Sequence, residues 1–595
     1  MVTETTGNDT EADTDIAPKP ASGIQNGAPF GVDPDAITDA DQPRSRRVLV
    51  ISIAIASLLV LSAIAVPQGL HSVVEVLSNG LIRLTGWYYV LIIFIVVCFL
   101  LVLALSRRGD IKLGREDDEP AYSLRSWFAM LFAAGMGIGL VFFGASEPLQ
   151  HFINPSPDVG PGVGERARSA MASTFLHWGL SAWAIYAIVG LAVAYAVHRR
   201  GFPISIRWTL SSLLGRKTDS GLGDAIDVIA VIGTLIGVAT SLGFGIMQFS
   251  SGIEFLTGIQ LPRSAILATA GAITLLATIS VTLGLDRGIK NLSNANLALA
   301  AVFLTLVLVL GPTLFIFNEL VQDIGCYLQN FVSLSLRTLP FEGAAGMDWM
   351  HSWTIYYWGW WMSWSPFVGV FIARISRGRT VREFILGTVL VPTLVTFLWF
   401  AVMGGTALFQ QIYGETSLLV DGNMVDNTMT LFLMLANLPA GKLLSGIAMV
   451  LLVIFFVTSA DSASFVMSIL STNGDPDVKA PVRLAWALFT GAVTIALLAS
   501  GGSTFDGISA LQTLVITSAA PLSAIIALMA IALWRNLSRE SDAIRSRRNE
   551  RLRSQLVDDT ARQVASSTNR DASTIGLPTS HWSPSSGRIP TKKQE

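Results

Sequence analysis

The sequence predicts an all-α integral membrane protein with about twelve transmembrane helices. Hydrophobic residues make up 51% of the 595-residue chain, charged residues make up only 14%, and the mean hydropathy is +0.56. Apolar runs long enough to cross a bilayer recur along most of the chain. The predicted spans lie near residues 48–66, 86–106, 127–149, 172–197, 225–252, 264–284, 291–318, 351–374, 383–410, 443–470, 481–500 and 511–534.

The distribution of Lys and Arg predicts how the chain is oriented in the membrane. Alternate loops carry most of these residues, as in 107–115 and 374–382, whereas the loops between them hold scattered cations such as Arg83 and Arg263. Cytoplasmic loops of membrane proteins are enriched in Lys and Arg. We therefore expect a multi-pass protein of the cell (plasma) membrane, with an even number of spans and both termini in the cytoplasm.

Composition divides the chain into six segments. The first 45 or so residues are rich in Asp, Glu, Gly and Pro and lack the apolar core of a signal peptide, so they predict a disordered acidic tail. The segments are this cytoplasmic tail at 1–47, two N-terminal transmembrane helices with their loop at 48–126, a membrane block at 127–318, an amphipathic connection at 319–350, a second membrane block at 351–534, and an Arg-rich cytoplasmic tail at 535–595.

The sequence carries no signature of an enzyme. The HExxH, GxSxG, P-loop and dinucleotide-binding patterns are absent. Its two cysteines, Cys98 and Cys326, cannot form a disulfide framework or a zinc site of the usual spacing. We therefore expect neither catalysis nor ATP-driven transport, no organic cofactor and no nucleic-acid partner.

An unusually aromatic segment lies in the eighth predicted span, where Trp353–Trp364 reads WTIYYWGWWMSW. Tyr357, Trp361 and Trp364 share one helix face, and converging π-faces attract a cation that has no N–H to donate, such as a quaternary ammonium group. The alternative is an aromatic belt at the membrane boundary. Such a belt gathers at helix ends, whereas this run covers about three turns, so the segment favours a ligand site.

A second aromatic group lies in the fourth predicted span. Trp178, Trp183 and Tyr186 fall within about 140° of helix arc, so they could face a common partner, and they could equally face lipid. His177 beside them is more often a satisfied core histidine than a ligand.

Glycines weaken the third predicted span at Gly135, Gly137 and Gly139, since each costs a helix about 1 kcal/mol relative to alanine. A broken membrane helix offers N–H groups to a carboxylate and carbonyl groups to a cation. The competing interpretation is close helix packing through the GxxxG pattern from Gly135 to Gly139. The glycines alone do not decide between the two.

Hydroxyl groups cluster in the tenth predicted span, at Thr458, Ser459, Ser462 and Ser464. They could bond back to their own helix. Alternatively, Thr458 and Ser459 with nearby carbonyl groups could bind a sodium ion, which needs several oxygen ligands. Asp461 is an intramembrane acid and hence a functional candidate, although it lies near the cytoplasmic end and could simply bind a neighbouring helix.

The C-terminal tail predicts an exposed, Arg-rich helix. Its regulatory candidates are Arg545, Arg547, Arg548, Arg551 and Arg553. One interpretation is a solvated tail that obeys the positive-inside rule. The other is a sensor that docks on anionic membrane lipid or on the acidic N-terminal tail, a salt-dependent contact suited to osmotic stress.

Five motifs resemble the betaine/choline/carnitine transporter family, in particular its sodium-coupled glycine betaine transporters of actinobacteria. They are AAGMGIG at 133–139, HWGLSAWAIYAIVGL at 177–191, LSNAN at 292–296, WTIYYWGWWMSWSPFVGVFIARISRGR at 353–379 and TSADSAS at 458–464. The likeness covers roughly residues 48–534. It implies a leucine-transporter-like fold, in which two extra helices precede two inverted five-helix repeats at 127–318 and 351–534, and it implies a homotrimer.

The resemblance also implies an activity: sodium-coupled uptake of a compatible solute by alternating access, activated by osmotic stress, with glycine betaine as the first candidate solute. Ectoine, proline or carnitine are alternatives on the same fold, and an osmosensing receptor or channel is an alternative class. The implied substrate site comprises Trp178, Trp183, Tyr186, Ser241, Trp360, Trp361 and Trp364 with Gly135, Met136, Gly137 and Gly139. One implied sodium site comprises Thr458 and Ser459 with the carbonyls of Ala133, Met136 and Phe455, and a second comprises Thr234 and Phe367.

Two positions bear on how closely the chain follows the family. Sodium-coupled members tend to offer a second Thr one turn after Thr234, whereas this chain has Val238, which puts the second sodium site in doubt. Proton-coupled choline carriers of the family carry an acid at the third glycine of the motif. Here Gly139 is retained, which favours sodium coupling and a zwitterion over choline.

Overall fold

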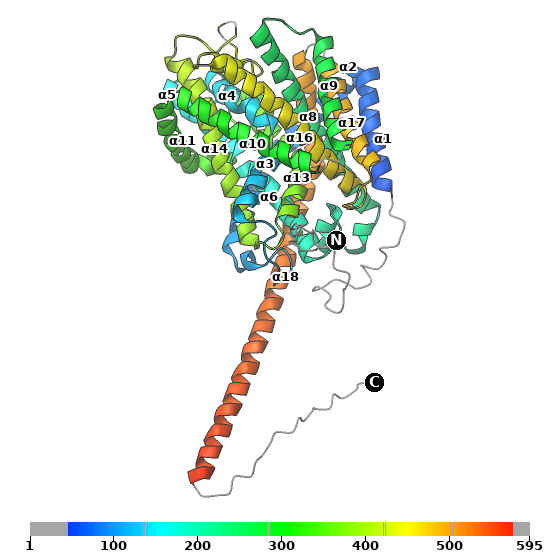
Figure 1. Cartoon of the computed structure of the whole chain (residues 1–595), viewed down its shortest axis with the longest axis vertical. Helices are drawn as coiled ribbons and strands as arrows, with labels where there is room; N and C mark the ends of the chain where they lie inside the picture. Colours follow the sequence, from blue (N-terminus) through cyan, green and yellow to red (C-terminus); the bar gives the residue numbers. More distant parts are fainter. Residues whose placement is uncertain are drawn as a thin grey trace, which may run out of the picture. The chain divides into compact units, whose positions relative to one another are not determined.

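The computed structural model describes residues 46–574 except for 136, 283–285, 421, 423 and 501–503, and its described part is helical with two isolated β-bridges (Figure 1). The α-helices are α1 Arg47–Ala65, α2 Pro67–Leu105, α3 Leu124–Gly135, α4 Ile138–Ile153, α5 Val163–Trp178, α6 Leu180–Ala194, α7 Ser211–Leu214, α8 Gly221–Thr257, α9 Arg263–Thr282, α10 Asp286–Leu310, α11 Thr313–Ser335, α12 Gly343–Met350, α13 Tyr356–Ile375, α14 Val381–Tyr413, α15 Thr430–Ala436, α16 Gly441–Ser471, α17 Ala480–Ser500 and α18 Thr504–Thr574.

Within the described residues, nine helices are long and apolar enough to cross a membrane, and α10 with α11 forms a tenth candidate that bends by 108°. The predicted third and eighth spans are not among them. The third predicted span is split into α3 and α4, and each of these helices is too short to count as a span. The eighth predicted span is α13, whose mean hydropathy is lowered by its many Trp and Tyr residues, which are less hydrophobic than aliphatic residues. With these two added, the count agrees with the twelve expected, and the prediction of an all-α membrane protein is confirmed.

The third span breaks at its glycines. Helix α3 ends at Gly135 and α4 begins at Ile138, and between them Gly137 has an extended backbone with φ −143° and ψ −158°. Tight packing occurs at the same place, because a Cβ on Gly139 would lie within 3 Å of two tryptophan rings. The structure therefore has a helix break at Gly137 and close packing at Gly139, while the binding of a ligand by the broken segment stays a prediction.

The fourth span is also interrupted, which the sequence did not predict. Gly179 separates α5 from α6 with φ −95° and ψ −133°, and a Cβ there would lie 2.7 Å from the Phe397 ring. The break lies directly after Trp178. It therefore ends one helix at a predicted ligand-binding residue.

Two predicted boundaries differ from the structure. The segment 67–85, expected as a connection, is the first half of the 39-residue helix α2, which begins with Pro67. The seventh span was expected to run to 318, but α10 ends at Leu310, because Pro312 cannot continue the helix, and α11 leaves at a steep angle.

Helix α13 forms the centre of the bundle. It packs along α6, α8 and α18, while α16 packs against α8 and α14 packs against α4 (Figure 1). Large exposed apolar side chains lie on peripheral helices, for example Leu58 on α1, Leu105 on α2 and Leu314 on α11. Exposed apolar residues of this number suit a lipid environment.

Loops from the predicted positive set meet on one side of the bundle. The Leu113 N–H donates to the Arg379 carbonyl at 2.8 Å, and the Gly378 N–H donates back to the Leu113 carbonyl at 2.8 Å. Arg199 then donates to Glu540 of α18 at 2.6 Å. These loops share one side, as the alternation of charge requires. That this side is the cytoplasm stays a prediction.

The C-terminal tail continues the last span as one helix. Helix α18 has 71 residues, and all five candidate regulatory arginines, Arg545, Arg547, Arg548, Arg551 and Arg553, are exposed on it. The helical part of the tail prediction therefore agrees with the structure, while its role stays a prediction.

Candidate functional site

The two aromatic groups predicted from sequence come together inside the protein. The Trp361 ring stacks on Trp360 at 4.7 Å between centroids, meets Trp178 edge-on at 4.9 Å and lies 6.0 Å from Tyr186. Trp183 packs on Tyr186 at 5.6 Å. These rings are at most 5% exposed, so the alternative of rings that face lipid is wrong. We call Trp178, Trp183, Tyr186, Trp360, Trp361 and Trp364 the aromatic cage.

The break in the third span lies against this cage. A Cβ on Gly137 would be 3.4 Å from the Trp364 ring and 3.7 Å from the Ser459 hydroxyl. A Cβ on Gly139 would be 2.8 Å from the Trp178 ring and 2.9 Å from the Trp360 ring. The glycines therefore allow a backbone segment to lie between the cage and the hydroxyl group of α16.

This close approach predicts a large effect of one methyl group. Gly139→Ala would press on two rings and should lower stability by about 1–3 kcal/mol while weakening ligand binding. The measurements are thermal unfolding and uptake in proteoliposomes. The control is Gly271→Ala, where a Cβ on α9 would meet nothing within 4 Å. Equal behaviour of the two variants would contradict the prediction.

Two donors of the cage have no partner in the described structure. Trp360 Nε1 donates to the Ser241 hydroxyl at 3.2 Å, and Trp361 Nε1 donates to the His177 carbonyl at 2.7 Å. Trp364 Nε1 and the Tyr186 hydroxyl are buried with no hydrogen-bond partner. Buried polar groups are normally satisfied, so unpaired donors in a ring cluster fit a ligand with acceptor oxygens.

One residue of the first candidate sodium site, Ser459 of α16, lies next to the glycine break. Ser459 approaches Gly137 as described above, and the Thr458 hydroxyl donates to its own helix, to the Ile454 carbonyl at 2.9 Å. Phe455 is buried on the same helix, and Ala133 lies in the last turn of α3. Met136 lies outside the described residues. The structure thus brings α16 to the break, while Thr458 shows the back-bonding geometry that the sequence left open.

The second candidate sodium site holds one unpaired hydroxyl. Thr234 of α8 is fully buried and its hydroxyl has no partner. Phe367 lies on α13, which packs along α8, and its ring contacts Trp364 at 5.6 Å. Val238, one turn after Thr234, is also fully buried. The site therefore offers one side-chain oxygen where a sodium ion needs several.

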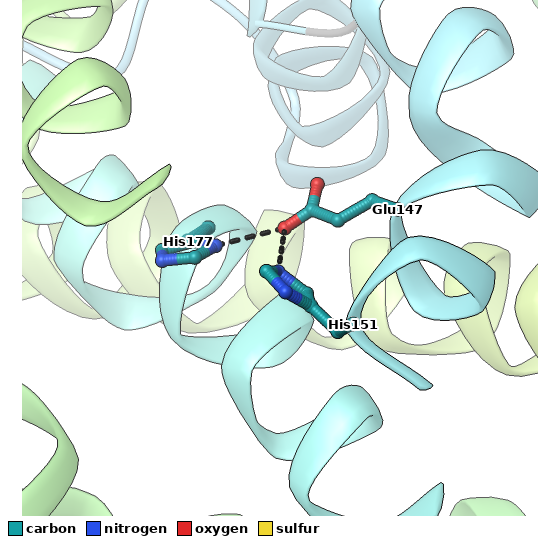
Figure 2. A group of neighbouring side chains, drawn as sticks. All are labelled: Glu147, His151 and His177. Carbon is teal, nitrogen blue, oxygen red and sulfur yellow. Dashed lines mark hydrogen bonds and ion pairs between the residues drawn. The ribbon is translucent and has the colours of Figure 1, made fainter. Parts of the chain in front are cut away.

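A buried carboxylate beside the cage was missed by the sequence analysis. The Oε2 atom of Glu147 accepts hydrogen bonds from Trp178 Nε1 at 2.6 Å and from the Tyr357 hydroxyl. Its Oε1 atom faces His177 Nδ1 at 2.8 Å and His151 Nε2 at 3.3 Å (Figure 2). All three charged or ionisable side chains are at most 2% exposed. The sequence did contain a signal for this residue: Glu147 lies in the predicted span 127–149, and an acid within a span is a functional candidate by default.

This carboxylate positions two aromatic rings. Trp178 belongs to the cage, and Tyr357 packs on Trp361 at 5.7 Å. Hydrogen bonds to an ionised acceptor are short and strong, so they restrict how each ring can turn. His177 is buried and has a hydrogen-bond partner at each ring nitrogen, because its Nε2 also lies 3.1 Å from the Thr354 hydroxyl.

A helical membrane bundle with a broken helix, a buried aromatic cage and unpaired donors in its interior has the architecture of a secondary transporter. The chain matches the model of the betaine/carnitine/choline family transporters over residues 47–542 and belongs to this family. It is therefore a membrane transporter and not an enzyme, and the resemblance found in the sequence is confirmed.

Individual relatives cover most of the chain. An uncharacterized transporter of Mycobacterium tuberculosis is 46% identical over 80% of this chain and 81% of its own length. The glycine betaine transporter OpuD of Bacillus subtilis is 43% identical over 83% of this chain and 95% of its own. The ectoine/hydroxyectoine transporter of Virgibacillus pantothenticus is 38% identical over 83% of this chain and 96% of its own.

Proposed function

We propose that this transporter is a sodium-coupled symporter that takes up a compatible solute, with glycine betaine as its first substrate. The observation that carries the proposal is the placement of the glycine break between the aromatic cage and Ser459. This placement puts groups suited to a methylated cation, a carboxylate and a sodium ion side by side. Family membership and the glycine betaine transporter among the relatives support it.

The chemistry of the cage matches a zwitterion. A trimethylammonium group has no N–H, so it binds best to π-faces, and a desolvated cation over one face contributes about 2 kcal/mol. A carboxylate on the same molecule can accept from the backbone at Gly137 and from the unpaired Trp364 Nε1. Position 139 is glycine rather than an acid, so the site has no carboxylate at this position that would favour choline over a zwitterion. Ectoine, which carries a delocalised cation and a carboxylate, is the main alternative.

The rings of Trp178, Trp360 and Trp361 contact one another, so a ligand between them has to separate them. Trp178 and Trp361 are only 4.9 Å apart between centroids. Trp178 ends α5 at the Gly179 break, and Trp361 belongs to α13, so the two rings lie on separate helices that can move apart. Binding and release through such a separation is how alternating access would operate here.

The sodium sites decide how strongly the solute is accumulated. A sodium ion that descends a tenfold gradient and about 100 mV releases about 3.7 kcal/mol, so two ions supply about 7 kcal/mol and one ion supplies half. Ser459 and Thr458 at the glycine break form the first site. Because Val238 removes an oxygen from the second site, we propose that the first ion carries most of the coupling.

The substitution of Ser459 by alanine tests the first sodium site. Ser459→Ala should raise the sodium concentration for half-maximal uptake by about tenfold, the effect of losing one ligand worth about 1.4 kcal/mol. The control is Ser464→Ala on the same helix, where the hydroxyl bonds back to the Ala460 carbonyl at 2.6 Å. The measurement is sodium-dependent uptake at fixed solute. A sodium dependence that is unchanged in Ser459→Ala would remove this residue from the site.

The location and regulation of the transporter complete the proposal. We place it in the plasma membrane with both termini in the cytoplasm, as a homotrimer. The exposed arginines of α18 would contact anionic membrane lipid in a salt-dependent way, each contributing about 1 kcal/mol near such a surface. This contact would be the sensor that activates uptake under osmotic stress.

Uptake of labelled glycine betaine into proteoliposomes tests the proposal. Sodium, potassium and osmolality are varied separately, and labelled ectoine and choline serve as competitors. We expect accumulation that requires a sodium gradient. Solute flux without a sodium requirement and with single-channel currents would instead identify a channel, and the absence of any accumulation would favour a receptor.

A further inference from the structure

The Glu147 carboxylate is a buried negative charge with no cationic side chain bonded to it. Within the described part of the chain, its ion-pair partners are only His151 and His177, and Glu147 is 0% exposed. The Arg337 guanidinium, 4.7 Å from the Trp349 ring, makes its ion pair with Asp158 at 3.7 Å. Buried charges are normally paired with a cation or bound to a metal, so this cluster calls for a cationic ligand.

Three ligand atoms converge at this position. Glu147, His151 and His177 each offer one ligand atom, and the three atoms lie within 4.8 Å of one another. Figure 2 shows the two imidazole rings directed at the same carboxylate oxygen, Oε1. Ligand atoms around a tetrahedral zinc ion, with bonds of about 2.0–2.1 Å, stand about 3.3 Å apart. Small shifts of these side chains would therefore seat an ion among them.

Two of the three ligands, Glu147 and His177, have supporting hydrogen bonds of the kind found in metal sites, whereas His151 Nδ1 has no partner among the described residues. Glu147 Oε2 is held by Trp178 and Tyr357, which leaves Oε1 free to bind. The other nitrogen of His177 faces the Thr354 hydroxyl, which can accept the ring N–H as readily as donate to it. Ligating histidines and carboxylates are usually fixed by hydrogen bonds of this kind.

We propose that Glu147, His151 and His177 bind a divalent transition metal of the zinc type. Through Glu147, the ion would stabilise the position of Trp178 in the aromatic cage. Two imidazole nitrogens and one carboxylate oxygen favour zinc over calcium or magnesium, which prefer oxygen ligands. The site is three-coordinate from the protein, so a water molecule would complete the tetrahedron.

Metal binding can be measured on the purified full-length protein without any transport assay. The protein, prepared without a polyhistidine tag, is incubated for hours with zinc or with EDTA, desalted and submitted to elemental analysis and thermal unfolding. We expect one zinc ion per protomer and a higher unfolding temperature in zinc than in EDTA. His151→Phe, which keeps a ring against Trp353, should lose the ion and unfold at the same temperature in both buffers.

Two further variants sharpen the result. Thr354→Val removes only the hydroxyl behind His177 and should weaken zinc binding by about tenfold. His71→Gln is the matched control, because His71 and Glu75 are also a His–Glu pair, 3.8 Å apart, but lie exposed on α2, so its zinc content should be unchanged.

Several results would overturn the metal site. Wild-type protein that binds no zinc, or that unfolds at the same temperature in zinc and EDTA, would contradict the proposal that these three residues bind a metal. Full zinc content in His151→Phe, or loss of zinc in His71→Gln, would place the ion elsewhere. Because transport is not measured, failure here leaves the proposed function untouched.

Discussion

Trp361→Ala is expected to raise the half-saturation concentration for glycine betaine by about 30-fold, while the amount of protein in the membrane changes little. The size follows from losing one desolvated cation–π contact of about 2 kcal/mol, at about 1.4 kcal/mol per factor of ten. Trp361 is the ring most central to the cage, since it contacts Trp178, Tyr186 and Trp360. The measurement is initial uptake against substrate concentration, normalised to reconstituted protein.

Two control variants separate binding from packing. Trp361→Phe keeps a π-face and should retain part of the affinity. Trp486→Phe removes an equally buried indole on α17, bonded to Ser471 at 3.0 Å and not part of the cage, and should leave the half-saturation concentration unchanged. If Trp361→Ala lowers protein yield as much as affinity, the ring contributes to packing and the cage is not the substrate site.

Much of the site could be predicted because its residues follow helical periodicity. Trp361 and Trp364 share a face of α13, and Trp183 and Tyr186 share a face of α6, so each pair could be identified within its own span. Three glycines within five residues made a break near Gly137 one of two expected outcomes, the other being close helix packing. That the two aromatic groups meet is a tertiary contact, which the family resemblance implied and periodicity alone could not give.

The features that were missed depend on contacts between distant segments. At the Gly179 break a side chain would collide with the Phe397 ring of α14 and with the Phe175 carbonyl, and a single glycine in an apolar run gives no local sign of that distant ring. The network around Glu147 draws on α4, α5 and α13, so no single segment revealed it. Helix α2 begins at Pro67, a residue type that is favourable at a helix N-terminus, in a segment that the sequence analysis expected as a connection.

The physical link between solute and ion runs through one backbone segment. Gly139 lies close to the Trp178 and Trp360 rings, and Gly137 lies close to the Trp364 ring and the Ser459 hydroxyl. Under the proposed function, a substrate carboxylate and a sodium ion bind to the two sides of the same break, so each favours the other electrostatically. A residue that holds the Trp178 ring in place should therefore affect the affinity for the solute and also the affinity for sodium.

Glu147→Leu is the second variant for which we expect a large effect. Leucine removes the acceptor for Trp178 Nε1 and for the Tyr357 hydroxyl, and it leaves both donors buried. Losing a hydrogen bond to a charged group costs about 1.5–3 kcal/mol, which corresponds to about 10- to 100-fold. The half-saturation concentration for solute should therefore rise by this factor, with a smaller rise in that for sodium. Uptake kinetics measure the half-saturation concentrations for solute and for sodium, and thermal unfolding of the same preparation measures the stability of the variant.

Two comparisons show whether Glu147 acts through these hydrogen bonds. Glu147→Gln keeps a carbonyl oxygen for the two rings, because its amide can turn its N–H groups toward the histidines, so its half-saturation concentration should rise less than in Glu147→Leu. Glu319→Gln changes another buried acid, which lies against Gly405 on α14 and outside the cage, and should leave solute affinity unchanged. If the leucine and glutamine variants lose the same solute affinity, then the charge of Glu147 sets this affinity, and the hydrogen bonds from Trp178 and Tyr357 do not.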